Sequence, residues 1–262
     1  MILSAGGKIL KQNLNHFEAS KLPGTTVDDI DLLKFRLYCS DYRGMEWDEE
    51  TDYKQLLYNF QIIDENGQLT VVGALFFAKT VCRFLPQAGI EMNFFDGLDK
   101  TAHIKDYKSV ESDIPALIAS AEQFVKFNSR TEAEFNPEET RRVDRHDYEP
   151  FVVRELITNA FMHRDWSIFG QKIRLNMFRD RLEVFSPGNI PNTLNLTRAL
   201  AGISYYRNPV VAQMLKDYKL AEKAGRGLQK IMKFYKVNRL KDPVFDISEA
   251  YFRVVLCRAK YS

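Results

Sequence analysis

The chain has 262 residues, of which 45% are hydrophobic and 27% are charged, and its formal net charge is +2. This composition excludes a disordered chain, and no run of roughly 18 apolar residues is present that could cross a membrane as a helix. The three cysteines are far apart and include no Cys-x-x-Cys pair, so we expect reduced thiols in a cytoplasmic protein rather than disulfides or a zinc site.

Charge is distributed unevenly along the chain. Residues 1–150 hold 17 Lys and Arg against 26 Asp and Glu, a net charge of −9, whereas residues 151–262 hold 20 against 9, a net charge of +11. A basic half favours a phosphate-bearing partner, either a nucleotide or a nucleic acid such as DNA. The alternative interpretation is a solvated basic surface that faces an acidic neighbouring domain.

The N-terminal third is predicted to be a linker followed by a helical module. Residues 1–26 end in the turn-forming stretch Leu22-Pro23-Gly24-Thr25-Thr26, which is typical of a linker. Apolar residues then recur at helical spacing between Asp28 and Lys79, and Asn66-Gly67 indicates a tight turn between two short extended pieces. We therefore predict a helical, winged-helix-like module over residues 27–88.

Residues 89–262 are predicted to form an α/β sandwich, which makes the chain an α+β protein. The apolar patterns predict strands at 90–95, 172–178, 181–185 and 250–256, helices at 114–127 and 149–163, and another helix after Gly227. Residues 131–147 are expected to be a charged connection. We expect a mixed sheet with helices on one face.

The segment with the clearest chemistry runs from Arg154 to Asp165. Glu155, Asn159 and His163 are four residues apart, so a helix places all three on one face. A carboxylate, an amide and an imidazole gathered in this way can orient a water molecule and hold a hard cation such as magnesium, with the imidazole near a phosphate. The alternative is an ordinary solvated helix face.

The pattern Glu-x-x-x-Asn-Ala-x-x-His-Arg-Asp resembles the N-box of the HATPase-type domain in the RecG-like helicase C-terminal family, which is similar to the GHKL ATPases. The resemblance implies that Glu155 positions or activates water and that Asn159 holds the magnesium ion that bridges the phosphates of ATP. From their own positions and chemistry, His163 and Arg164 are further candidates for contacting the nucleotide. For Arg164, the alternatives are pairing with Asp165 or capping the helix end.

Two glycine loops follow in the order expected of that family. Ser186-Pro187-Gly188 stands where GHKL proteins carry a loop around the adenine, although the aspartate that takes the adenine amino group is missing. Gly225-Arg226-Gly227 resembles the second glycine box, where backbone amides at a helix N-terminus approach phosphates. The resemblance therefore implies that Gly188, Gly225, Arg226 and Gly227 shape the cofactor pocket, with a mobile lid around Arg207-Asn208-Pro209.

The likeness extends over residues 17–256, and its first part resembles the linker that follows an AlbA-type Schlafen domain in family members. The family is described as regulatory and DNA-associated, which implies a transcriptional regulator. The segment from Gly73 to Thr80 approaches the Walker A pattern, but Ala78 replaces the second glycine and Phe76 and Phe77 fill the loop. The chain is therefore not expected to be a helicase motor on its own, and weak ATPase activity is left open.

Two functional hypotheses follow. The first is a nucleotide-binding regulator in which Glu155 and Asn159 serve water and magnesium. The second is a non-enzymatic module that keeps the GHKL-like scaffold, binds no nucleotide, and docks DNA or a protein through its basic half. A third hypothesis is a dimerisation or scaffold segment that serves the N-terminal domain of family members, with a homo-oligomer as one form, because a sequence does not show assembly.

Overall fold

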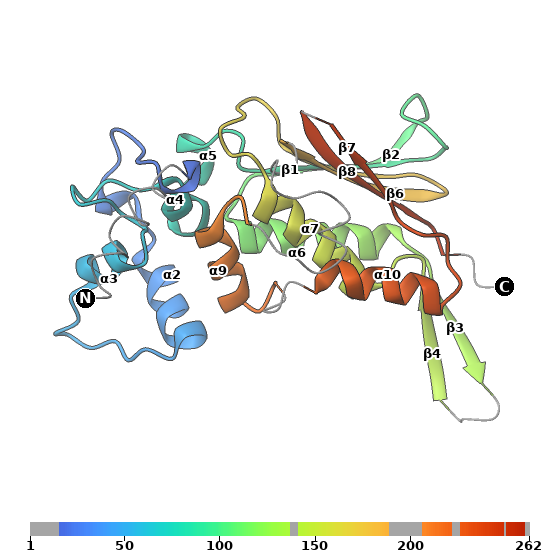
Figure 1. Cartoon of the computed structure of the whole chain (residues 1–262), viewed down its shortest axis with the longest axis horizontal. Coiled ribbons are helices and arrows are strands. Elements are labelled where there is room, and N and C mark those ends of the chain that lie inside the picture. The colour runs from blue at the N-terminus through green and yellow to red at the C-terminus, as the bar shows by residue number, and fades with distance from the viewer. Residues whose placement is uncertain (1–15, 137–140, 189–205, 222–225, 249, 260–262) are drawn as a thin grey trace, which may run out of the picture.

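A computed structural model describes residues 16–136, 141–188, 206–221, 226–248 and 250–259. Figure 1 shows a sheet with helices packed beneath it and a helical module at the N-terminal end. The mixed α+β architecture expected from the sequence is therefore confirmed at this level. None of the helices in the described ranges is both long enough and apolar enough to cross a membrane.

The sheet has six strands in the order β2-β1-β5-β6-β8-β7. β1 runs parallel to β5, and the other neighbouring pairs are antiparallel, so the sheet is mixed as predicted. The bounds of the strands are Ile90–Phe95 for β1, Ile104–Val110 for β2, Ile173–Met177 for β5, Arg181–Pro187 for β6, Val244–Ile247 for β7 and Tyr251–Cys257 for β8.

Three helices cover one face of this sheet: α6 (Ile114–Asn128), α7 (Pro150–His163) and α10 (Gly227–Val237). α6 begins where the Asp113 side chain accepts a hydrogen bond from the peptide N–H of Ala116, and its apolar stripe from Ile114 to Val125 is buried. α7 begins with a proline at its first position, and it packs between α6 and β6. The sheet and these helices therefore fix the position of the Glu155 face.

The segment predicted as a charged connection is instead a two-stranded ribbon. β3 (Thr131–Asn136) pairs antiparallel with β4 (Arg141–His146), and the ribbon projects away from the body of the protein (Figure 1). Its high charge concealed the strands, because alternation of apolar and polar residues is the main signal for a strand in a sequence. The expectation of a charged connection at 131–147 missed these two strands.

The N-terminal module is helical, with short elements. Their bounds are Phe17–Ala19 for η1, Val27–Asp29 for η2, Leu32–Leu37 for α2, Tyr38–Tyr42 for the π turn η3, Tyr53–Asn59 for α3, Val71–Phe77 for α4 and Val81–Phe84 for α5. Around Asn66-Gly67 the chain forms a single bridge between Ile63 and Leu69 rather than two named strands. The winged-helix comparison therefore stays a prediction.

The module and the sandwich share one hydrophobic cluster that reaches from Ile30 to Leu256. The aromatic ring of Tyr38 lies 5.3 Å from that of Tyr218, which follows helix α9 (Pro209–Asp217), so the cluster continues across both parts. α9 lies between the module and the other helices (Figure 1). The division that we predicted at residue 88 remains a prediction.

Candidate functional site

Glu155 and Asn159 form a hydrogen-bonded pair on α7. The amide Nδ2 of Asn159 donates to Glu155 Oε1 at 2.8 Å, and both side chains are only partly buried. The opposite side of the helix is buried against the core through residues such as Leu156 and Ile157. One helical turn therefore sets a carboxylate and an amide side by side at the protein surface.

Gly227 brings the first turn of α10 directly against this pair. A Cβ atom at Gly227 would overlap the carboxylate of Glu155, so any other residue would force the two apart. Gly227 is the first residue of α10, where the peptide N–H groups have no partners within the helix and the helix dipole is positive. The structure thus brings Gly227 against Glu155, a residue far from it in the sequence.

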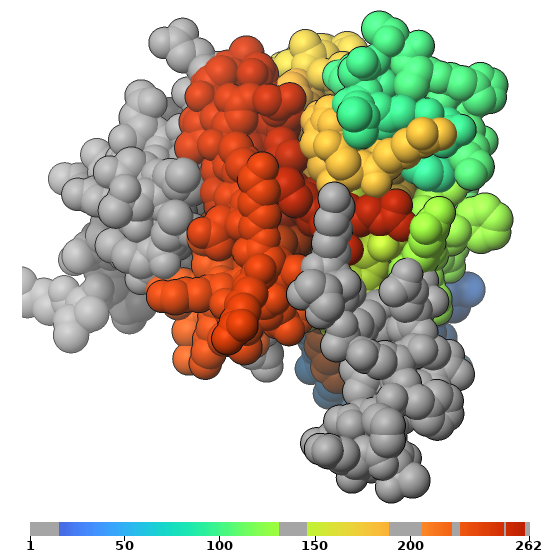
Figure 2. All heavy atoms as spheres, turned by 90° about the vertical axis from the view of Figure 1, so that its right-hand side faces the viewer, coloured from blue at the N-terminus to red at the C-terminus, as the bar shows by residue number. Residues whose placement is uncertain are grey.

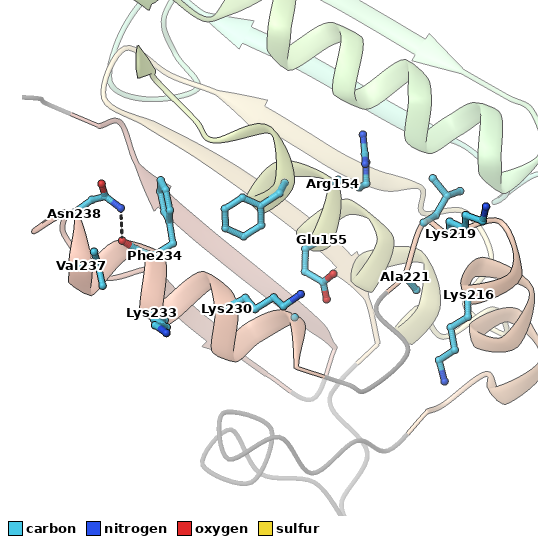
Figure 3. A pocket seen from close by; sticks show the side chains of 13 residues that line it. Arg154, Glu155, Lys216, Lys219, Ala221, Lys230, Lys233, Phe234, Val237 and Asn238 are labelled. Atoms are coloured by element: carbon cyan, nitrogen blue, oxygen red, sulfur yellow. Dashed lines mark hydrogen bonds between the residues drawn. The ribbon is translucent and has the colours of Figure 1, made fainter. Parts of the chain in front are cut away.

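A cavity of about 820 Å³ opens beside Glu155 and Gly227. Among the described residues that line it are four lysines from α9, the turn after it and α10, and one carboxylate, that of Glu155. Figure 3 shows Lys230 on α10 pointing toward Glu155 on α7. The lining residues are Phe151, Arg154, Glu155, Lys216, Lys219, Leu220, Ala221, Gly227, Lys230, Lys233, Phe234, Val237 and Asn238. We call this cavity the lysine pocket.

The lysine pocket also has an apolar end. The rings of Phe151 and Phe234 meet edge to face at 5.4 Å, and Val237 beside them is largely exposed. A flat ligand group can cover such an aromatic surface while its charged end reaches the lysines. The pocket therefore combines an apolar surface with a cationic one.

Polar oxygens at the pocket suit a hard cation, provided that phosphate oxygens or water supply its remaining ligands. Glu155, which lines the pocket, and Asn159, which is hydrogen-bonded to it but is not itself among the lining residues, offer carboxylate and amide oxygens, which magnesium prefers. Within the described residues, no group of three or more His, Cys, Asp or Glu side chains could hold a metal by itself. Magnesium in this pocket would thus need phosphate oxygens and water to complete its shell.

Gly188 lies near the end of α7 and is not among the residues that line the lysine pocket. Its φ of +98° is a backbone conformation that residues other than glycine rarely adopt, and a Cβ there would come within 2.5 Å of the Cβ of Asp165. Its peptide N–H donates to the carbonyl of Ala250 at 2.9 Å. The described geometry assigns Gly188 to a tight turn, and its expected part in an adenine loop stays a prediction.

The other two members of the second glycine box differ in what the structure describes. Arg226 directly precedes α10, and its side chain is exposed and does not cap the helix. Gly225 lies outside the described residues. Of the described members of the Gly-x-Gly pattern, Gly227 lies against the carboxylate of Glu155.

Arg164 has a different environment from the one expected of a phosphate ligand. Its side chain is fully buried, and its guanidinium donates to the carbonyls of Asp165, Ile168 and Gln171 at 2.6, 2.9 and 2.6 Å. The guanidinium carbon also lies 4.6 Å from the ring centre of Trp166. Burial lowers the pKa of Arg164 to about 10, so it remains protonated at neutral pH. In the described geometry Arg164 organises the loop after α7, and its expected place near the nucleotide stays a prediction.

The segment expected to act as a mobile lid is held firmly by α7. Asn208 is buried, and its amide donates to the carbonyls of Met162 and Arg164 at 2.9 and 2.8 Å. Arg207 pairs with Asp165 at 2.9 Å. The carbonyl groups at the end of a helix lack partners within the helix, and Asn208 supplies one for Met162. Arg207 and Asn208, just before α9, therefore hold the start of α9 against the end of α7.

His163 lies at the end of α7 in a stack of rings. Its ring is nearly parallel to that of Tyr206 at 6.0 Å, and the Lys216 ammonium lies 4.2 Å from the Tyr206 ring centre. Burial, and to a smaller extent the charge of Arg207, lower the pKa of His163 to about 4. The imidazole is therefore neutral at pH 7 and is suited to packing rather than to attracting a phosphate.

This lowered pKa predicts how stability depends on pH. In the unfolded chain His163 takes up a proton near its usual pKa of 6.5, whereas in the folded protein it does so only near 4. Its contribution is complete above about pH 6.5 and is lost as the pH falls toward 4. Relative to a His163→Gln variant, the wild type should lose about 2–3 kcal/mol of unfolding free energy between pH 7 and pH 4.

Urea unfolding of both proteins at several pH values checks this expectation. Glu18, whose pKa burial raises to about 7, titrates in both proteins, so the difference between them isolates His163. Two curves that stay parallel from pH 7 to pH 4 would mean that the imidazole is freely protonated in the folded protein.

Sequence reasoning missed the lysines of the pocket. Lys230 and Lys233 are three residues apart on α10, a spacing that places both on one helix face. Lys216 and Lys219 come from α9 and the turn after it, a helix that we did not predict. The excess of 20 basic over 9 acidic residues in the second half was the available signal, but it did not say which lysines gather.

Comparison with known proteins gives a family match for part of the second half of the chain. Residues 170–256 match the family model described as "Putative ATP-dependent DNA helicase recG C-terminal". The resemblance to the RecG C-terminal family is confirmed for these residues. The match covers about one third of the chain; it includes Gly188 and Gly227 and begins after Glu155 and Asn159. A search of curated proteins finds no match.

Solved structures extend the likeness of the fold to most of the chain. The crystal structure of the DIP2311 protein from Corynebacterium diphtheriae is similar to 93% of this chain, with a TM-score of 0.72 and 19% sequence identity. The matched region is 48% of that protein, so this chain spans about half its length. At this identity the likeness concerns the fold alone.

Proposed function

We propose that the protein is an ATP-binding regulatory domain and that the lysine pocket is its nucleotide site. The observation that carries the proposal is the contact between Glu155, to which Asn159 is hydrogen-bonded, and the glycine at the start of α10. An ATPase-type family match that includes Gly227 supports it. A carboxylate alone would repel phosphates, but four lysines and a helix N-terminus offset that charge.

Each part of the pocket has a distinct task in this proposal. Asn159 provides an oxygen ligand for magnesium. Glu155 either orients a water molecule beside the ion or is itself a second oxygen ligand. Lys216, Lys219 and Lys230 bind phosphate oxygens as point charges. The aromatic pair of Phe151 and Phe234 packs against the base. Bound magnesium would neutralise phosphate charge.

ATP with magnesium is expected to raise the thermal unfolding midpoint of the protein. A ligand that binds only the folded state at 100 times its dissociation constant adds about 2.7 kcal/mol of stability. For a chain of this size each kcal/mol corresponds to a shift of roughly 2–4 °C. Differential scanning calorimetry with increasing ATP checks the rise, and ATP with EDTA serves as the magnesium-free control.

Isothermal titration calorimetry of the protein with ATP and magnesium tests whether the nucleotide binds at all. If millimolar ATP with magnesium produces neither heat nor a shift of the midpoint, the nucleotide proposal fails. AMP as a second ligand tests whether the lysines matter, because a monophosphate engages fewer of them and should bind more weakly.

A second candidate function is a DNA-binding module without nucleotide. Its supporting observation is the basic surface of α10, where Lys230, Lys233 and Lys236 are exposed; the helix lies open on the face shown in Figure 2. DNA affinity that comes from phosphate contacts falls steeply as salt rises. Fluorescence anisotropy with duplex DNA at 50 and 200 mM salt tests this candidate, and a flat response removes it.

A further inference from the structure

The N-terminal turn of α9 is held by a residue that is 192 positions away in the sequence. Glu18 is fully buried, and its two carboxylate oxygens accept hydrogen bonds from the peptide N–H groups of Val210 and Val211, each at 2.9 Å. These are orphan donors of the helix, since no carbonyl within α9 reaches them. Burial raises the pKa of Glu18 to about 7, and the hydrogen bonds from the peptide N–H groups of Val210 and Val211 oppose this rise.

The last turn of α9 is held by the helical module as well. The Tyr38 hydroxyl donates to Asp217 Oδ2 at 2.6 Å, and Arg43 pairs with the same carboxylate at 3.0 Å. The next residue, Tyr218, packs its ring 4.5 Å from Tyr42. Both ends of α9 are therefore attached to the N-terminal part of the chain.

The same last turn lines the lysine pocket. Lys216 lies one residue before Asp217, and Lys219 lies two residues after it. The carbonyl of Leu220 accepts a hydrogen bond from the Thr158 hydroxyl on α7 at 3.3 Å. α9 thus extends from the Glu18 contact at its first turn to the lysine pocket at its last turn.

We propose that Glu18 is a positioning residue for the pocket: it fixes α9, and α9 places Lys216 and Lys219 beside the ligand. The inference rests on the proposed function only for the identity of that ligand. Because coupling between two sites is reciprocal, a bound ligand must also strengthen the hold of Glu18 on α9.

A double-mutant cycle separates positioning from general loss of structure. At pH 8, where Glu18 is ionised, a Glu18→Ala variant should bind ATP with magnesium about fivefold or more weakly than the wild type. In a Lys216→Ala, Lys219→Ala background the same change should have almost no effect, since the lysines that Glu18 positions are gone. An equal loss in both backgrounds contradicts the proposal.

Hydrogen exchange of the ligand-free protein gives a readout that does not depend on ATP. Glu18→Ala should speed amide exchange along α9 as far as residues 216–221, and Glu18→Gln, which keeps one acceptor oxygen, should do so less. Glu65→Ala, an exposed acidic residue of the same module, is the matched control. Faster exchange confined to Val210 and Val211 overturns the positioning role. If exchange spreads along α9 but the wild type binds no ATP, the proposed function fails and the positioning role stands.

Discussion

Asn159→Ala is expected to weaken magnesium-dependent ATP binding by roughly 10- to 100-fold, a loss typical of removing one member of a metal site. The change removes an oxygen ligand and also the amide that holds Glu155 Oε1 at 2.8 Å. Glu155 then loses its fixed orientation beside Gly227. Isothermal titration calorimetry with and without magnesium measures the effect, which should be much smaller when magnesium is absent.

The matched control for this change is Asn59→Ala. Asn59 is an exposed asparagine at the end of α3, outside the lysine pocket, and its one side-chain hydrogen bond joins it to Gln55. This variant should bind ATP as the wild type does. Equal magnesium-dependent affinity of the wild type and Asn159→Ala would show that the amide is no ligand, even if ATP binds elsewhere on the chain.

The elements with strong apolar patterns were predictable from the sequence. The strand expected at 90–95 is β1, with the same bounds, and the helix expected at 114–127 is α6, which ends one residue later. Each of these segments buries one clear stripe, so the periodicity of its apolar residues reflects its contacts.

The elements that were missed lie at edges or take their stability from distant contacts. β2 is an edge strand with mostly exposed residues, so its sequence carries little alternation. α9 begins at a proline where we expected a lid, and its first turn depends on the carboxylate of Glu18. A contact across 192 residues leaves no local signal in the sequence.

The candidate site was predictable in part, for the same reason. The spacing of Glu155 and Asn159 follows from helix geometry, and their hydrogen bond is local. The approach of Gly227 was expected only from a family resemblance. The contribution of Lys216 and the burial of Arg164 depend on how whole elements pack, so neither could be derived from spacing.

Arg164→Ala should cause the largest loss of stability among the substitutions considered. The three carbonyls that its guanidinium serves would be left without that donor in the interior, and a cavity would open beside Trp166. Costs of these kinds add to about 3–5 kcal/mol. For a chain of this size that corresponds to a fall in the unfolding midpoint of roughly 6–20 °C, measured by differential scanning calorimetry at pH 7.

Arg154→Ala is the matched control, because the same substitution there removes a half-exposed arginine whose pairing with Glu122 at 2.7 Å lies at the surface. Its cost should stay below about 1 kcal/mol. Arg164→Lys decides between the structural role and the phosphate role that the sequence analysis gave to Arg164. A lysine keeps the charge but cannot serve three carbonyls in the guanidinium geometry, so stability should fall while ATP affinity of the remaining folded protein is unchanged. Normal stability with lost ATP affinity would instead return Arg164 to the nucleotide site.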